Sequence, residues 1–324
     1  MNEFASFMYY ILPIILMNMA PLALVALGGL YTEKSGVINI ALEGIMVMGA
    51  FTSVYAATLF TGWFAGMSIQ IVVLIGLLIG ALLGTIFSLT HAFASIHMKS
   101  NQIISATALN LFAVAFAVFT ARTIYGHRRL PFTETTMIRE VPFLSSVPII
   151  GPVFFTNAYL STYIIVLIFA ASMVILYKTK LGLRLRSCGE HPQAAESLGV
   201  NVYKIRYIGV LASGALAGMG GAAYAFTFQR QFGGEVFGFG FLALAVMISG
   251  QWRPMRILLV ALFFSFMRLL ATQSDSFPGL NQLNLPSQLY RMLPYVATLV
   301  VLAFTSKKSQ APRAAGEPYD SGKR

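Results

Sequence analysis

The sequence is poor in charged residues and in the side chains from which catalytic and metal sites are built. Charged residues make up 10% of its 324 residues, whereas a soluble domain has about a quarter. The only aspartates are Asp275 and Asp320, so no aspartate pair inside an apolar segment is available for metal or phosphate chemistry. His91 and His97 are spaced so that they do not share a helix face. We therefore expect no catalytic residue, no metal site and no cofactor.

A disulfide framework is excluded, because Cys188 is the only cysteine. It lies in a basic loop, which indicates a reducing compartment. A phosphate-binding loop is absent from the sequence as well. Its nearest approach, residues 28–35, has Glu33 where the second glycine should be, and no predicted strand precedes it. The chain is not expected to hydrolyse ATP unaided.

Apolar residues, in contrast, make up 57% of the chain. This composition predicts an all-α polytopic membrane protein with about eight to ten transmembrane helices. The formal net charge of +11 does not indicate nucleic-acid binding. The positive residues concentrate in loops and in the C-terminal tail, as the bias of Lys and Arg toward the cytoplasmic side requires.

About nine apolar segments are long enough to cross or nearly cross a bilayer. They cover residues 7–30, 38–60, 67–90, 103–120, 159–177, 207–228, 237–250, 255–271 and 288–305. The seventh is short and begins in a glycine-rich stretch, which predicts a half-helix or re-entrant element. Residues 121–157 should form the longest non-helical stretch. We expect residues 1–305 to form one transmembrane domain, followed by a disordered, basic cytoplasmic tail at 306–324.

Two of these segments carry small residues four positions apart, which predicts close packing against neighbouring helices. The third segment has Gly76, Gly80 and Gly84, and the sixth has Gly214, Gly218 and Ala222. We interpret this spacing as a packing signal and not as a binding site.

The stretch from 178 to 206 is the longest strongly charged interruption between two apolar segments. Its basic residues outnumber its two acids, Glu190 and Glu196, which predicts a cytoplasmic position. A short helix is expected in its middle, because Pro192 suits the first helical turn and Gly199 suits a left-handed cap. One small apolar face of that helix is formed by Ala194, Ala195 and Leu198. Two interpretations stay open: a docking site for a partner, or a solvated loop held against anionic headgroups.

Polar side chains inside apolar sequence are the candidates for a transport path. Asn39 and Glu43 are spaced to share a helix face. A carboxylate inside a membrane segment is costly, so Glu43 should face a cavity or a partner group. It contacts the transported molecule, or it caps or braces an unwound backbone, or it pairs with a nearby basic residue. A second cluster, Asn101, Ser105 and Asn110, either lines a path or makes hydrogen bonds between helices.

Arg268 stands near the end of the eighth apolar segment. A long cationic side chain in this position is expected to extend to the membrane interface.

Four blocks of the sequence together resemble a known family of transport proteins. They are residues 35–44 (SGVINIALEG), residues 101–110 (NQIISATALN), residues 182–199, and residues 240–254 with the end GQWRP. They resemble the permeases of the ABC importers for branched-chain amino acids and simple sugars, above all the nucleoside-importer permeases. The resemblance extends over most of residues 28–305.

The resemblance implies a permease subunit that works with a second homologous permease, a cytoplasmic ATPase and an extracytoplasmic binding lipoprotein, in a bacterial cell membrane. It also implies that the predicted loop helix is a coupling helix that seats in the ATPase. The corresponding residues are Glu190, Pro192, Ala194, Ala195, Glu196, Leu198 and Gly199. The order of Ala194, Ala195 and Glu196 departs from the usual Glu-Ala-Ala.

By the same resemblance, the transported molecule would be a nucleoside with a purine base, with a simple sugar as the alternative. Two other classes are less consistent with the sequence. A stand-alone secondary transporter normally has ion-coupling carboxylates at mid-membrane, and Glu43 is the only deep one. A membrane enzyme acting on lipids would need paired acids or clustered histidines.

Overall fold

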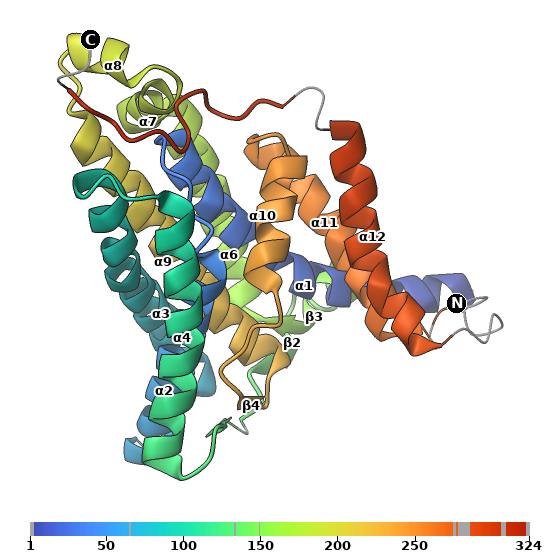
Figure 1. Cartoon of the computed structure of the whole chain (residues 1–324). Coiled ribbons are helices and arrows are strands. Elements are labelled where there is room, and N and C mark those ends of the chain that lie inside the picture. Colours follow the sequence, from blue (N-terminus) through green and yellow to red (C-terminus); the bar gives the residue numbers. More distant parts are fainter. Residues whose placement is uncertain are drawn as a thin grey trace.

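The computed structural model describes residues 3–64, 66–132, 134–148, 150–274, 277, 286–305 and 309–321. Within these ranges, seven helices are long and apolar enough to cross a membrane. They are α1 (Glu3–Lys34), α2 (Leu42–Trp63), α3 (Ile69–Ala92) with the π-helical extension η1 (Phe93–His97), α4 (Gln102–Tyr125), α6 (Leu160–Lys178), α9 (Val202–Phe228) and α11 (Pro254–Thr272). The prediction of an all-α polytopic membrane protein is confirmed (Figure 1).

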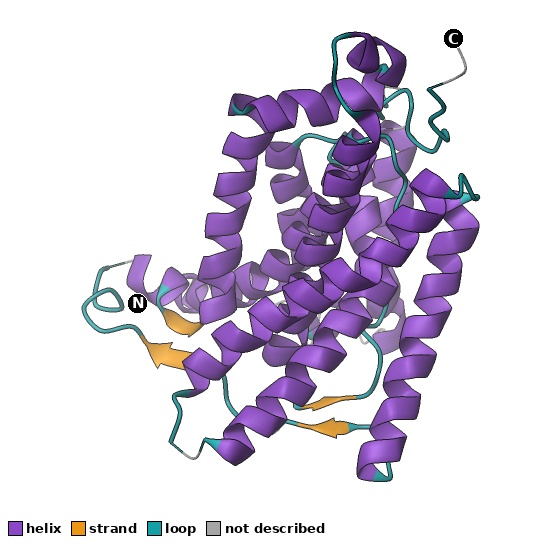
Figure 2. Ribbon diagram, turned by 90° about the vertical axis from the view of Figure 1, so that its left-hand side faces the viewer, coloured by secondary structure: helices purple, strands orange, loops and turns teal. Residues whose placement is uncertain are grey.

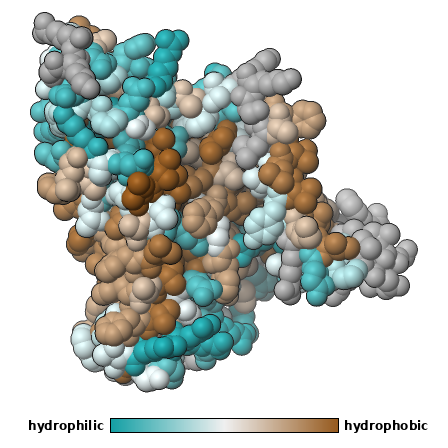
Figure 3. Space-filling model, in the orientation of Figure 1, coloured by the Kyte–Doolittle hydropathy of each residue, from teal (hydrophilic) through white to brown (hydrophobic). Residues whose placement is uncertain are grey.

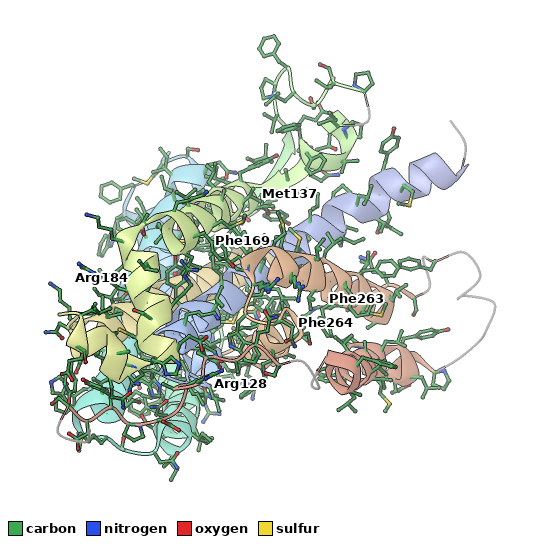
Figure 4. The ribbon with its side chains drawn as sticks, turned by 90° about the horizontal axis from the view of Figure 1, so that it is seen from above. Arg128, Met137, Phe169, Arg184, Phe263 and Phe264 are labelled. Carbon is green, nitrogen blue, oxygen red and sulfur yellow. The ribbon has the colours of Figure 1, made fainter. Side chains whose placement is uncertain are left out.

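Two further helices complete the bundle. The predicted half-helix is α10 (Phe239–Ser249), and α12 (Ser287–Thr305) matches the last predicted segment. Viewed from above, α12 lies at the edge of the molecule beside α11, whose Phe263 and Phe264 are labelled (Figure 4). Phe264 is fully buried, whereas Phe263 is 38% exposed. In Figure 3, hydrophobic side chains cover the middle of the visible face, and hydrophilic ones gather at its two ends.

The loop expected at residues 121–157 contains regular structure that the sequence analysis did not predict. Helix α4 continues to Tyr125, and the loop contains α5 (Ile150–Phe154) and three short strands, β1 (Leu130–Pro131), β2 (Met137–Glu140) and β3 (Thr156–Tyr159). β2 pairs with β3, and β1 pairs with the distant β4 (Gln231–Phe232) (Figure 2). Strands of two to four residues are too short to show an alternating apolar pattern in the sequence. Their stability comes from pairing with segments elsewhere in the fold.

Helix α9 lies at the centre of the bundle and packs against α1, α2 and α3. The predicted small-residue faces meet directly. A Cβ atom at Gly218 would collide with the Gly80 backbone, and one at Gly84 would collide with Gly214. The glycines therefore let two helix backbones touch. A Cβ at Gly221 would likewise strike the backbone of Met46 in α2.

The predicted cytoplasmic loop contains two helices instead of one. They are α7 (Lys180–Glu190) and α8 (Pro192–Ser197). The Thr179 hydroxyl caps α7 by accepting a hydrogen bond from the Gly182 amide. Pro192 begins α8 as expected, and Gly199 follows it in the left-handed conformation, with φ of +79°.

Residues 309–321 of the predicted tail contact the helical bundle. The Ala314 amide donates to the Gly189 carbonyl, and the Gly316 amide donates to the Gly36 carbonyl. Asp320 forms an ion pair with Lys99 at 3.0 Å. The segment buries Ala314 and Tyr319 and supplies hydrogen-bond partners near the ends of several helices.

Candidate functional site

The link between α1 and α2, residues 35–41, is not helical, and side chains from other helices satisfy its backbone. The Ile38 amide donates to Gln102 Oε1 at 2.7 Å, and the Ile38 carbonyl lies 2.9 Å from His91 Nε2. The Asn110 amide nitrogen donates to the Ile40 carbonyl at 3.0 Å. Unpaired backbone groups inside an apolar bundle are costly, so these contacts stabilise the broken segment.

Asn39 and Asn110 both make hydrogen bonds that stabilise this link. The Asn39 amide nitrogen donates to Ser213 Oγ in α9 at 3.1 Å, and its oxygen accepts from the Ala41 amide. Asn110 Oδ1 accepts from the Gly44 amide at 2.7 Å. Asn39 is fully buried. The structure thus brings two of the five predicted path residues together around one unwound segment.

Glu43 holds a second break in the backbone. Its two carboxylate oxygens accept hydrogen bonds from the amides of Gly238 and Gly240, at 2.8 and 2.6 Å. These amides begin α10, where unpaired N–H groups and the helix dipole favour a negative charge. Of the interpretations of Glu43, the brace for unwound backbone matches the hydrogen bonds that the structure contains.

Helix α10 begins near the middle of the bundle. Its eleven residues span about 16 Å, half of a hydrocarbon core of about 30 Å. Its C-terminal end lies beside the ordered tail, since the Gln310 amide donates to Gln251 Oε1. The Glu43-capped start of α10 therefore lies about halfway through the membrane segments, which is where transporters place binding sites on broken helices.

Arg268 does not extend to an interface, so the sequence-based prediction for it is wrong. Its guanidinium carbon lies 4.5 Å from the centre of the Phe239 ring and 5.8 Å from that of Tyr224. Its Nη2 donates to the Tyr224 hydroxyl at 3.2 Å. The attraction of a cation to the faces of two aromatic rings holds Arg268 inward. Nothing in the sequence around Tyr224 of α9 or Phe239 of α10 indicated that either ring would contact Arg268.

A cavity of about 590 Å³ adjoins this cluster between α10, α11 and α12. Its size is typical of small-molecule sites. The polar side chains that line it are Arg268, Thr272 and Thr298, and its aromatic ones are Phe237, Phe241 and Tyr295.

Asn101 and Ser105 lie elsewhere. Asn101 caps α4, since its side-chain oxygen accepts from the amides of Ile103 and Ile104. The Ser105 hydroxyl lies 3.1 Å from His91 Nδ1. Both line a separate, open cavity of about 520 Å³ between η1 and α4. The predicted path residues therefore divide into a brace around the α1–α2 link and a second group at the start of α4.

Helix α8 presents most of its predicted docking residues to the surface. Leu198 is 85% exposed, and Ala194, Glu196 and Gly199 are also exposed. Pro192 and Ala195 are buried and anchor the helix, and Glu190 at the end of α7 is half-buried. An exposed leucine next to basic helices gives this end of the molecule an apolar protrusion. Arg184 of α7, at the margin of the molecule in Figure 4, belongs to the same basic surface.

These features define a class: a multi-pass α-helical membrane protein with broken helices at mid-depth and no metal-binding cluster among its described residues. The model of a family described as the permease component of branched-chain amino acid transport systems matches residues 11–302. The chain belongs to this permease family. The resemblance inferred from its sequence blocks is confirmed.

Individual relatives cover nearly the whole chain. The nucleoside ABC transporter permease protein NupC of Lactococcus lactis is 40% identical over 96% of this chain and 98% of its own length. The guanosine ABC transporter permease protein NupQ of Bacillus subtilis is 39% identical over 97% of each chain. A putative glucose ABC transporter permease protein, TsgC13 of Haloferax volcanii, is 29% identical over 91% of each. No solved structure matches the chain.

Proposed function

We propose that the chain is the membrane-spanning permease subunit of an ATP-driven importer for nucleosides, with purine nucleosides as its substrates. The observation that carries this proposal is the end-to-end similarity, at 40% and 39% identity, to two permeases named for nucleoside and guanosine transport. The relative named for glucose is more distant, at 29%. A sugar permease is therefore the second candidate.

The proposed transporter also contains a second homologous permease, a cytoplasmic ATPase and an extracytoplasmic binding lipoprotein, in a bacterial cell membrane. The surface of α8 supports the ATPase contact. A short helix that buries Pro192 and Ala195 while exposing Leu198 transmits rigid-body motion to α6 and α9, which its loop connects. ATP hydrolysis belongs to the partner and not to this chain.

The proposed path passes the broken backbone at mid-depth. Asn39, Glu43 and Asn110 shape this path by fixing the α1–α2 link and the start of α10. Asn101 and Ser105 line the other cavity, which we assign to the same path at its α8 end.

Uptake by the reconstituted transporter tests the proposal. Proteoliposomes that contain this chain, its partner permease and the ATPase, with the binding lipoprotein added outside, should accumulate radiolabelled guanosine only when ATP is enclosed. Unlabelled nucleosides should compete, and glucose should not. Competition by glucose alone would favour the sugar permease. Uptake driven by an ion gradient in vesicles without the ATPase would favour a secondary transporter.

A further inference from the structure

The cavity between α10, α11 and α12 has aromatic faces that are open to a ligand. Phe237 is 64% exposed and Phe241 is 49% exposed, and both line this cavity. Phe237 precedes α10 with a positive φ of 54°, a conformation that is uncommon for a bulky residue. Backbone held in such a conformation is found where a site needs a particular side-chain direction.

Arg268 supplies the cavity with a fixed cation. The guanidinium is planar and carries five N–H donors. One donor is used on Tyr224, while the stack on Phe239 fixes the plane. Glu43, the nearby carboxylate of the bundle, is already bonded to two backbone amides. Among the described residues, no carboxylate lies within ion-pair distance of Arg268. A half-buried cation in a membrane segment, with no paired acid among the described residues, is typical of a ligand site.

Nucleobases carry hydrogen-bond acceptors that the Arg268 guanidinium can bind and a flat ring that an aromatic side chain can stack on. A purine with an oxygen at position 6 offers two adjacent acceptors, O6 and N7, which a guanidinium binds with two parallel hydrogen bonds. Adenine presents an amino donor at position 6, so it cannot form this pair. Any base stacks on an aromatic face. A sugar lacks the conjugated planar ring and the O6 and N7 pair of acceptors.

We propose that this cavity is a nucleobase-binding subsite of the transport path, in which Arg268 donates to the O6 and N7 edge of a 6-oxopurine nucleoside while Phe241 stacks on the base. This inference rests on the proposed nucleoside transport and adds its specificity. Phe239 and Tyr224 act as positioning residues, because they hold the guanidinium and do not touch the base.

Protection of a cavity thiol from alkylation measures binding directly. Thr298 of α12 lines the cavity, so the variant Thr298→Cys is placed in the complete transporter in nanodiscs without the binding protein. Native Cys188 gives little background, because it is buried and burial raises the pKa of its thiol. The rate of maleimide labelling is followed against guanosine and adenosine. Guanosine should protect at a lower concentration than adenosine.

Arg268→Gln, added to this background, should raise the protecting concentration of guanosine about ten- to hundredfold while changing that of adenosine by less than about threefold. Phe241→Ala should weaken protection by both nucleosides to the same extent. Arg256→Gln is the matched control, since Arg256 is an exposed arginine on the same helix and does not line the cavity. It should behave as the parent. The melting temperatures of the purified complexes, measured for Arg268→Lys as well, show whether a variant has lost binding because it is misfolded.

Three outcomes overturn the inference. Equal shifts for guanosine and adenosine on Arg268→Gln, or no shift, would reduce Arg268 to a packing residue. Nucleoside uptake by a Thr298→Cys transporter whose introduced thiol is never protected would move the subsite elsewhere and leave the proposed function intact. Uptake of glucose without any nucleoside uptake would remove the proposed function itself, and this inference with it.

Discussion

The two halves of the bundle are packed by different means. In α2, α3 and α9, glycines bring helix backbones into contact, and the Gly80–Gly218 crossing leaves no room for a Cβ atom. Between α10, α11 and α12, in contrast, lies an open cavity of about 590 Å³, lined in part by Phe237, Phe241 and Tyr295. Close-packed interiors transmit displacement as rigid bodies, while loosely packed segments can change shape. The comparison indicates a rigid frame beside a more loosely packed wall that can change shape.

The largest expected effect comes from filling the glycine contact. Gly218→Leu should destabilise the protein by several kcal/mol, because its side chain has to enter the space of the Gly80 backbone and overpacking commonly costs about 1–3 kcal/mol even when side chains can adjust. Thermal unfolding in detergent measures this loss. The control is Gly62→Ala in α2, where nothing lies near an added Cβ. Equal melting temperatures for both variants would contradict a rigid frame.

A smaller effect is expected at the junction of the two halves. Glu43→Gln replaces an acceptor oxygen with an amide donor that faces a backbone N–H, so one hydrogen bond to α10 is lost. Removing a buried partner of this kind costs about 1–3 kcal/mol. Uptake should fall together with hydrogen-exchange protection of the amides at 238 and 240. Unchanged exchange at those amides would show that Glu43 does not hold α10.

The contact between the tail and α9 should contribute less to stability than the Glu43 cap on α10. Arg206 of α9 is buried, its Nη1 donates to the Glu317 carbonyl at 2.9 Å, and the Tyr319 ring lies 5.6 Å away. Tyr319→Ala removes a desolvated cation–aromatic contact of about 2 kcal/mol, whereas Tyr319→Phe keeps the ring. Limited proteolysis after residue 308 should accelerate in the first variant only. Equal cleavage of both would leave the tail without this anchor.

The smallest effect on stability is expected at Leu198. Leu198→Ser should change the free energy of unfolding by less than about 0.5 kcal/mol, since the side chain is exposed. Under the proposed contact with an ATPase, it should still reduce ATP-driven uptake about tenfold, as loss of a central interface residue does. Melting and uptake are measured on the same preparation. Gln193→Ser, exposed on the same helix, is the control. Normal uptake by Leu198→Ser would argue against docking through this residue.

Much of the fold follows from composition and spacing. Apolar runs located the spans, and the glycine-rich start of residues 237–250 predicted the half-helix, because each signal is local. The spacing of Gly76, Gly80 and Gly84 predicted a packed face, though not that its partner is Gly214 and Gly218. Because a carboxylate inside a membrane segment is costly, the sequence also predicted that Glu43 has a partner group. Which group it engages depends on a segment almost two hundred residues away.

The misses share one cause. Arg268 turned inward because Phe239 and Tyr224 offer ring faces from other helices, a contact with no periodicity in the sequence. His91 lacks metal-ligand spacing with His97, and the sequence did not indicate that it reaches the Ile38 carbonyl of the α1–α2 link. The composition of the tail likewise gave no sign of its hydrogen bonds to the Gly36 and Gly189 carbonyls. Single polar residues acquire roles only from what the fold places opposite them.

The sequence by itself determined that this chain spans a membrane as a helical bundle and belongs to a permease family, because apolar length and local motifs are properties of consecutive residues. Only the tertiary structure decided that Glu43 caps α10 and that Arg268 faces a cavity. Both depend on charge and hydrogen bonding between segments far apart in the chain, where the cost of burying a polar group is met by whichever partner the packing supplies.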